Sequence, residues 1–323
     1  MCKFIIVLFG PTGVGKSSLA EKLARKFSGE IVNADVGQFY LPFSIGTAKP
    51  EWKDNPIAHH LFDILDSPKN LTVCDYRSKL IECVKDIHGR KNVPIVVGGS
   101  TFYLLSLFFP PLSLAANIKK NIDRDGSQDL WQKLYDIDPV RAQELSKNDE
   151  YRIKRALDIW ESSGIKPSKL KPPYNPVSRF IYVYVDRDRS QLYERIDKRT
   201  IEMVRDGWIE EVEAVKEKKW KKFLCEKKLI GYPDVLDYLE GKIATKDELI
   251  NIIQKKTRNY AKRQICFGKM ILRKLKTAQE EDKLHSEDSR SKEISVNLTD
   301  EQVEKKLEEL EKMITQFAAK IGK

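Results

Sequence analysis

The sequence predicts an α/β protein in which a parallel sheet of the P-loop NTPase type is flanked by helices and interrupted by a helical insertion. Residues 4–9 form an unbroken apolar run, which is typical of a buried parallel strand. The run leads into residues 10–17, which have the Gly-x-x-x-x-Gly-Lys-Ser spacing of a phosphate-binding loop. Apolar residues then recur at helical spacing from Leu19 to Phe27, so the loop precedes a helix N-terminus. This context makes a simple glycine-rich turn the weaker interpretation.

The phosphate-binding loop is the first candidate site. Glycines in such a loop let backbone N–H groups point inward, where they and the helix dipole hold phosphate oxygens. Lys16 can reach a terminal phosphate, and the Ser17 hydroxyl is placed to bind Mg²⁺. We therefore expect a diphosphate or triphosphate to bind at Gly10, Pro11, Thr12, Gly13, Val14, Gly15, Lys16 and Ser17.

Composition limits the class of protein. The chain has 323 residues, 41% of them hydrophobic, which is enough for one large α/β domain with an insertion. Its five cysteines follow no paired spacing, so neither a disulfide framework nor a zinc site is indicated. The first apolar run ends in the phosphate-binding loop instead of a small-residue cleavage site, and no apolar stretch reaches membrane-spanning length. We expect a cytoplasmic protein without a targeting segment.

The positive charge is clustered. The net charge is +10, and two dense basic runs, at residues 216–228 and 255–276, contain interleaved aromatic residues. Basic stripes with aromatics are typical of surfaces that bind a polyanion such as RNA. Solvated helix faces explain the charge equally well, so charge alone does not decide between the two.

Two further strand ends carry polar residues. Residues 30–35 read as a strand that ends in Asp35, and residues 93–97 read as a strand followed by two glycines, Ser100 and Thr101. Ligands of open parallel sheets bind at the carboxyl ends of the strands, so we expect these residues to share a crevice with the phosphate-binding loop. Asp35 as a turn residue and Ser100 as a helix N-cap are the structural alternatives.

The sequence of the second half predicts an inserted helical domain, a further strand with its helix, and a C-terminal segment. Residues 113–176 contain short helical patterns and no strand signal, which indicates an inserted helical domain between core segments 1–112 and 177–275. A strand at 179–186 precedes a helix on which Arg195 and Arg199 share a face, suited either to a leaving phosphate group or to surface ion pairs. Residues 276–323 read as a polar linker, as far as Lys292, and an amphipathic helix that docks on its own domain.

Taken together, seven segments in this order resemble the tRNA dimethylallyltransferases, also called tRNA isopentenyltransferases. The resemblance extends over about residues 4–275, and no zinc-finger motif follows, as in the bacterial type. The matching segments are Gly-Pro-Thr-Gly-Val-Gly-Lys-Ser (10–17), Asn-Ala-Asp-x-x-Gln-x-Tyr (33–40), Ile-Gly-Thr-Ala-Lys-Pro (45–50), His-His-Leu-x-Asp (59–63), Val-Gly-Gly-Ser-x-x-Tyr (97–103), Ile-Gly-Tyr (230–232) and Tyr-Ala-Lys-Arg-Gln (260–264).

The resemblance implies a reaction and its partners. A dimethylallyl group passes from dimethylallyl diphosphate to the N6 amine of the adenosine immediately 3′ of the anticodon of a tRNA, and diphosphate is released. That chemistry requires a base, for which Asp35 is the candidate, and neutralisation of the leaving group, which suits Lys16, Ser100, Arg199 and Mg²⁺ bound to Ser17. We expect a monomer.

The resemblance also implies which residues contact tRNA. Three segments of this chain stand at the family's tRNA-binding positions, although Val36-Gly37 and Leu41-Pro42 replace the residues that are usual there. The implied contacts are Asp35, Val36, Gly37, Gln38, Tyr151, Arg152, Ile153, Lys154, Arg155, Lys228, Leu229, Ile230, Gly231, Tyr232 and Pro233.

Three other functions fit part of the sequence. A P-loop kinase or NTPase that binds ATP would use Asp186, at the end of the strand at 179–186, as a Mg²⁺ ligand. A protein that only binds RNA would explain the charge but would leave the phosphate-binding loop unused. Adenylate isopentenyltransferases share the early motifs, whereas the basic second half of this chain favours a polymeric acceptor.

Overall fold

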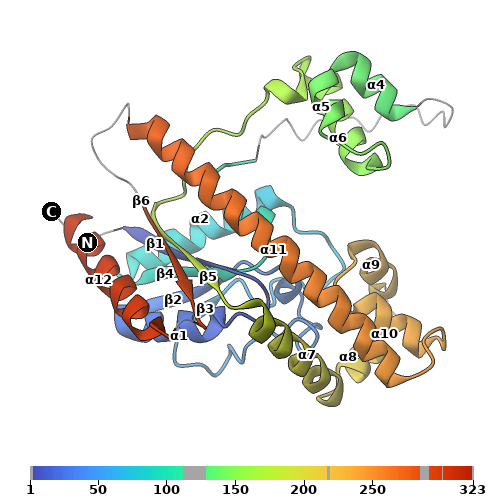
Figure 1. Cartoon of the computed structure of the whole chain (residues 1–323), viewed down its shortest axis with the longest axis horizontal. Helices are drawn as coiled ribbons and strands as arrows, with labels where there is room; N and C mark the ends of the chain where they lie inside the picture. Colours follow the sequence, from blue (N-terminus) through green and yellow to red (C-terminus); the bar gives the residue numbers. More distant parts are fainter. Residues whose placement is uncertain (1–2, 112–128, 217–218, 284–290, 300, 322–323) are drawn as a thin grey trace. The chain divides into compact units, whose positions relative to one another are not determined.

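The computed structural model describes residues 3–111, 129–216, 219–283, 291–299 and 301–321 (Figure 1). The chain divides into two compact units, one made of residues 1–108 and 176–323 and the other of residues 109–175. None of the helices that the structure describes is both long and apolar enough to span a bilayer.

The larger unit contains a parallel sheet of six strands in the order β3-β2-β4-β1-β5-β6. Phe9, the last residue of β1, pairs with Gly98 of β4 and with Tyr184 of β5, so these strands end at the same edge. The predicted parallel α/β core is therefore confirmed. The strands are β1 (Phe4–Phe9), β2 (Gly29–Asn33), β3 (His59–His60), β4 (Val93–Gly98), β5 (Arg179–Asp186) and β6 (Ser291–Asn297).

Helices cover both faces of the sheet. Phe4, Ile6 and Leu8 alternate along β1 and pack in one core with residues of α1 and α12, whereas Phe9 faces Gly268 of α11. Helix α2 packs on β2 and β4. The helices of this unit are α1 (Lys16–Phe27), α2 (Val73–Gly89), α3 (Thr101–Leu105), α7 (Arg189–Arg205), α8 (Trp208–Lys216), α9 (Trp220–Lys227), α10 (Tyr232–Leu239), α11 (Lys246–Lys283), α12 (Val303–Ile321) and the 3₁₀ helix η1 (Val36–Phe39).

Residues 109–175 form a helical unit with its own small core. The helices are α4 (Leu130–Ile137), α5 (Pro139–Gln143), α6 (Glu150–Ser163) and the 3₁₀ helix η2 (Pro167–Lys169). Asp129, Asp138 and Asp149 accept backbone N–H hydrogen bonds at the starts of α4, α5 and α6. The part of the expected insertion at residues 113–128 lies outside the described residues.

The expected polar linker from residue 276 to residue 292 is wrong where the structure describes it. Helix α11 continues to Lys283, and residues 284–290 lie outside the described part of the chain. Strand β6 begins at Ser291 and pairs with β5 over its whole length. Only Ser291 and Val296 of β6 are buried. An edge strand of this kind needs few apolar residues, which is why its sequence reads as a linker.

Helix α12 docks on its own unit, as predicted. Leu310, Ile314 and Phe317 are buried in the sheet core, and the Phe317 ring lies edge-on against Phe4 with centroids 5.5 Å apart. Figure 1 shows α12 beside α1, and Lys26 of α1 forms an ion pair with Glu311. The apolar seam of α12 is therefore covered by the sheet and α1.

We expect Ile314→Ala to lower the free energy of unfolding by about 3 kcal/mol, because truncation of a fully buried isoleucine loses transfer energy and leaves a cavity. Gln316→Ala, at an exposed position of the same helix, is the matched control and should change it by less than about 0.5 kcal/mol. Urea denaturation followed by circular dichroism measures both. Equal stability of the two variants would show that α12 does not dock on the sheet in solution.

Candidate active site

Two cavities meet at the carboxyl ends of β1, β2 and β4. The phosphate-loop cavity has a volume of about 390 Å³ and is lined by residues of the loop, among them Gly13, Lys16 and Ser17. The second cavity has a volume of about 220 Å³. The residues that line both are Thr12, Asp35, Gln38, Thr47, Ala48 and Arg199. Because their walls are shared, a group bound in one cavity lies next to a group bound in the other.

The phosphate-binding loop has the backbone geometry that its glycines predict. Gly13 and Gly15 have φ angles of 81° and 111°, which side-chain-bearing residues rarely adopt. The Lys16 ammonium is buried under the loop and donates hydrogen bonds to the carbonyl oxygens of Gly10 and Pro11, each at 3.0 Å. Burial lowers the pKa of Lys16 to about 8, although the negative charge of Asp35 opposes this effect.

Two arginines of α7 extend the loop's positive charge. Arg195 Nε donates to the Gly13 carbonyl oxygen at 2.9 Å, and Arg199 Nη2 donates to the Thr12 hydroxyl at 2.6 Å. Both arginines line the phosphate-loop cavity. Burial lowers the pKa of Arg199, and the nearby Asp35 carboxylate opposes that shift.

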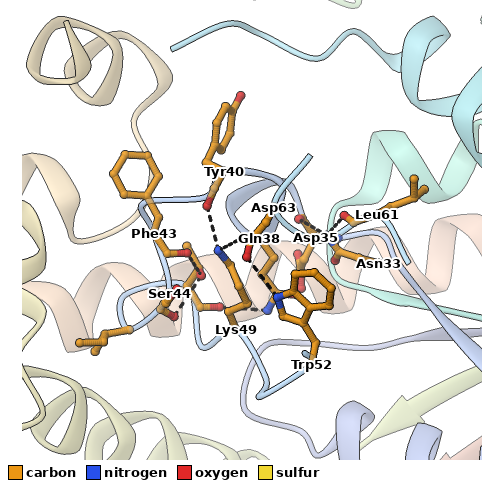
Figure 2. Close-up of polar contacts among 12 residues, drawn as sticks. Asn33, Asp35, Gln38, Tyr40, Phe43, Ser44, Lys49, Trp52, Leu61 and Asp63 are labelled. Carbon is orange, nitrogen blue, oxygen red and sulfur yellow. Dashed lines mark hydrogen bonds and ion pairs between the residues drawn. The ribbon is translucent and has the colours of Figure 1, made fainter. Parts of the chain in front are cut away.

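Asp35 is held in place by its neighbours at the strand ends. Its backbone N–H donates to Asn33 Oδ1 at 2.8 Å, and Asn33 Nδ2 donates to the carbonyl oxygens of Asp35 and Leu61 at 3.2 and 3.1 Å (Figure 2). The Ser100 hydroxyl donates to Asp35 Oδ1 at 3.1 Å and accepts from the Val36 backbone N–H at 2.9 Å. The carboxylate thus has a fixed orientation at the junction of the cavities.

Ser100 is bound to the Asp35 carboxylate at the end of β4. Among the described residues that line the two cavities, Asp35 is present and Ser100 is not. The Ser100 hydroxyl is instead engaged with Asp35 and Val36. The sequence places Ser100 at the correct strand end, but the direction of its hydroxyl depends on the tertiary structure.

A polar network holds the loop that follows Asp35. Figure 2 shows the Lys49 ammonium between the Tyr40 carbonyl oxygen and the Asp63 carboxylate. Trp52 Nε1 donates to the same carboxylate at 3.1 Å. Lys49 and Asp63 belong to two separate motifs of the sequence, and their buried ion pair joins them.

The wall that both cavities share is fixed through Gln38. Its side-chain amide donates to the carbonyl oxygens of Thr47 and Ala48 at 3.1 and 3.2 Å, and its backbone carbonyl oxygen accepts the Asp63 backbone N–H at 3.2 Å. Gln38 was expected to contact tRNA. The structure places it on the cavity wall with both amide N–H bonds directed at the loop.

Glu211, on α8, is a residue that the sequence analysis missed. Its carboxylate accepts backbone N–H hydrogen bonds from Ser44 and Ile45, each at 2.7 Å, and from Gly46 at 3.2 Å. It also accepts the Tyr232 hydroxyl at 2.7 Å. A single carboxylate thus joins the loop at 44–46 to the segment at 228–233. No local sequence signal marks it, because its partners are 165 to 167 residues away or belong to the next helices.

Gln264, the last residue of the motif at 260–264, connects two loops of the site. The side chain is 2% exposed, accepts the Thr12 backbone N–H at 2.8 Å and donates to the Gly99 carbonyl oxygen at 2.9 Å. It therefore links the loop after β1 to the loop after β4. A Cβ atom at Gly99 would lie 2.1 Å from Gln264 Nε2, so the glycine is required for this contact.

The segment at 228–233 borders the second cavity. Lys228, Leu229, Ile230 and Tyr232 line it, and so do Val36 and Gly37. Tyr232 is 1% exposed and contributes part of a wall, whereas Pro233 is not among the described lining residues. Gly231 has a φ angle of 85° and lies so close to the Trp208 ring that a Cβ atom would be only 2.2 Å from it.

The residues of α6 differ in exposure. Tyr151 is 81% exposed, and Arg152, Lys154 and Arg155 are also exposed, as tRNA contacts require. Ile153 is 1% exposed and belongs to the core of the helical unit. The Ile153 side chain is therefore not accessible to tRNA, because successive helix residues point in different directions and this one points inward.

The phosphate-loop cavity offers one hydroxyl ligand that suits Mg²⁺. The Ser17 hydroxyl is exposed in it, whereas no group of three or more His, Cys, Asp or Glu residues in the described part of the chain is placed to hold a metal ion. Mg²⁺ in proteins usually takes one or two protein oxygens and completes its octahedron with waters and substrate phosphate oxygens. The residues present therefore fit this cation.

Comparison with known proteins decides the family. Residues 38–271 match the family model described as IPP transferase. The tRNA dimethylallyltransferase of Syntrophomonas wolfei is 36% identical over 274 residues, which cover 82% of this chain and 88% of that protein. The chain belongs to the IPP transferase family. The tRNA dimethylallyltransferase of Carboxydothermus hydrogenoformans, another relative, is 37% identical over 286 residues and covers 83% and 89% of the two chains.

Solved structures of IPP transferases have the same fold. A eukaryotic dimethylallyltransferase acting on tRNA matches with a TM-score of 0.76 and 28% identity, over 92% of this chain and 74% of that one. The tRNA isopentenylpyrophosphate transferase of Bacillus halodurans matches with a TM-score of 0.66 and 27% identity, over 99% and 98%. The family resemblance found in the sequence is confirmed.

We expect Glu211→Ala to lower the free energy of unfolding by about 2 kcal/mol, because three backbone N–H groups and a buried tyrosine hydroxyl lose a charged acceptor. Glu210→Ala, at the preceding exposed position of α8, should change it by less than about 0.5 kcal/mol. Chemical denaturation compares the two variants. A Glu211→Ala protein as stable as the Glu210→Ala protein would show that this carboxylate does not hold the loop.

Proposed function

We propose that this IPP transferase is a tRNA dimethylallyltransferase, which transfers a dimethylallyl group from dimethylallyl diphosphate to the N6 amine of the adenosine immediately 3′ of the anticodon. The observation that carries the proposal is the position of Asp35, which lines both the phosphate-loop cavity and the second cavity. A base at that junction can act on an amine that enters from one side while the donor is bound on the other.

The donor's diphosphate binds in the phosphate-loop cavity. The buried Lys16, the guanidinium groups of Arg195 and Arg199 and the N-terminus of α1 supply the positive field for it. The Ser17 hydroxyl would hold Mg²⁺ there, and the cation would supply neutralisation of negative charge on the phosphates. As the bond between the allylic carbon and the diphosphate oxygen breaks, the charge that develops on the diphosphate is stabilised by Lys16 and the two arginines.

The acceptor adenine occupies the second cavity. The base must leave its stack in the anticodon loop, because its amine cannot reach a recessed carbon otherwise. The N6 nitrogen forms the new bond to the allylic carbon, and the Asp35 carboxylate takes the proton that this nitrogen loses. Ser100 keeps the carboxylate directed at the cavity through its hydrogen bond to Oδ1. Asn33 fixes the backbone of the same residue.

The tRNA itself binds through exposed cations. Arg152, Lys154 and Arg155 of the helical unit are exposed, and Lys228 borders the second cavity. The net charge of +10 favours a polyanionic partner. Action as a monomer in the cytoplasm is part of this proposal.

A kinase or NTPase mechanism is not favoured. Asp186 would have to bind Mg²⁺ next to the phosphates, but it is not among the described residues that line the phosphate-loop cavity. Its Oδ1 accepts the backbone N–H of Arg187 at 2.9 Å. The relatives that match this chain are named for dimethylallyl transfer to tRNA.

We expect Asp35→Asn to lower the rate of prenyl transfer at least about 100-fold, because an amide cannot take the proton of the amine. Affinity for tRNA should stay within about 2-fold, since the side chain keeps its size. Incorporation of labelled dimethylallyl diphosphate into tRNA measures the rate. Asp186→Asn, at the end of β5, is the control and should keep the wild-type rate. Undiminished turnover by Asp35→Asn would exclude this residue as the base.

We expect kcat/KM for dimethylallyl diphosphate to fall as the pH rises above about 8, because the pKa of Lys16 lies near that value and its neutral form no longer attracts the diphosphate. This fall in kcat/KM with rising pH should be absent in Lys16→Arg, whose guanidinium stays protonated over this range. Steady-state kinetics between pH 7 and about pH 10 would show the difference. The same fall in kcat/KM in both proteins would show that a group other than Lys16 causes it.

A further inference from the structure

An aromatic pair lies on the surface next to the second cavity. Phe102, in the first turn of α3, is 59% exposed although it is a large apolar side chain. Its ring contacts Phe267 of α11, with centroids 5.9 Å apart and planes at 66°, an edge-to-face arrangement. Two rings in this arrangement cover at most one face of each other. Phe102 therefore keeps at least one face that Phe267 does not cover.

The pair is continuous with the wall of the second cavity. Tyr260 and Gln264 of α11 line that cavity, and Phe267 follows Gln264 after about one helical turn. On the other side, Phe102 follows Ser100, which donates to Asp35, by two residues. A group bound to the pair would thus lie just outside the second cavity, which holds the target base.

The surroundings of the pair are cationic. Arg263 lies one turn before Phe267 on α11, is exposed, and holds its guanidinium 5.9 Å from the centre of the Tyr260 ring. Lys262 and Lys269 of the same helix are also exposed. Exposed aromatic faces flanked by arginine and lysine suit single-stranded nucleic acid, in which bases stack on the rings and phosphates meet the cations.

We propose that Phe102 and Phe267 form a stacking platform for an unpaired base of the anticodon loop, one that adjoins the target adenosine. The inference rests on the proposed function. When the target base leaves its stack, its neighbour loses a stacking partner. The exposed face of Phe102 replaces that partner, and Arg263 meets the adjoining phosphate. The platform acts on every base, since each has a π face, so it contributes affinity and not sequence selection.

Steady-state kinetics distinguish a loss of tRNA binding from a general loss of activity. Phe102→Ala should raise KM for a tRNA anticodon stem-loop about 10-fold and leave KM for dimethylallyl diphosphate within about 2-fold. Phe102→Tyr, which keeps the ring, should restore the wild-type KM. The matched control is Ile201→Ala, on α7, because Ile201 is 51% exposed and is not among the described residues lining the cavities. An unchanged KM in Phe102→Ala would overturn the platform.

Fluorescence tests the stacking directly. Stem-loops that carry 2-aminopurine on either side of the target adenosine should lose fluorescence on binding wild-type protein at one of the two positions. The same stem-loop should keep its fluorescence when saturated with Phe102→Ala. Equal quenching by both proteins would overturn the proposal, even if KM had changed. Failure of the proposed function is distinguishable, because it would appear as a wild-type protein that binds the stem-loop without prenylating it.

Discussion

Asp35 is held by hydrogen bonds from the ends of two neighbouring strands, and both cavities depend on that attachment. Asn33, at the end of β2, fixes its backbone, while Ser100, just after β4, binds its carboxylate. The cations of Lys16 and Arg199 lie close enough for the Asp35 charge to oppose the lowering of their pKa values by burial. The carboxylate therefore stabilises the charged forms of Lys16 and Arg199.

The remaining polar contacts hold the loops around Asp35 in place. Gln264 joins the loops after β1 and β4, the Lys49–Asp63 ion pair joins two distant motifs, and Glu211 attaches the loop at 44–46 to α8 and α10. Each contact satisfies backbone or charged groups that burial would otherwise leave unpaired at considerable cost. Such networks fix one arrangement of the cavity walls, because a partly satisfied network is less stable than a complete one.

The sequence predicts the elements whose signals are local. Apolar runs give the bounds of β1 and β5, and parallel strand ends bring Asp35 to the phosphate-binding loop. The missed features depend on distant partners. Glu211 acts on backbone groups about half a chain away, and β6 is an edge strand with little apolar content. Ile153 is buried although its neighbours in the motif are exposed, because a helix turns every third or fourth residue inward.

A crystal structure with a tRNA anticodon stem-loop and an unreactive thio analogue of dimethylallyl diphosphate would test the role of Asp35 as the base. In that structure the diphosphate should lie against residues 10–17 and the target adenine should lie in the second cavity. The N6 nitrogen should lie within about 3 Å of the Asp35 carboxylate and face the allylic carbon. An adenine bound outside that cavity, or an N6 nitrogen beyond hydrogen-bond reach of Asp35, would contradict it.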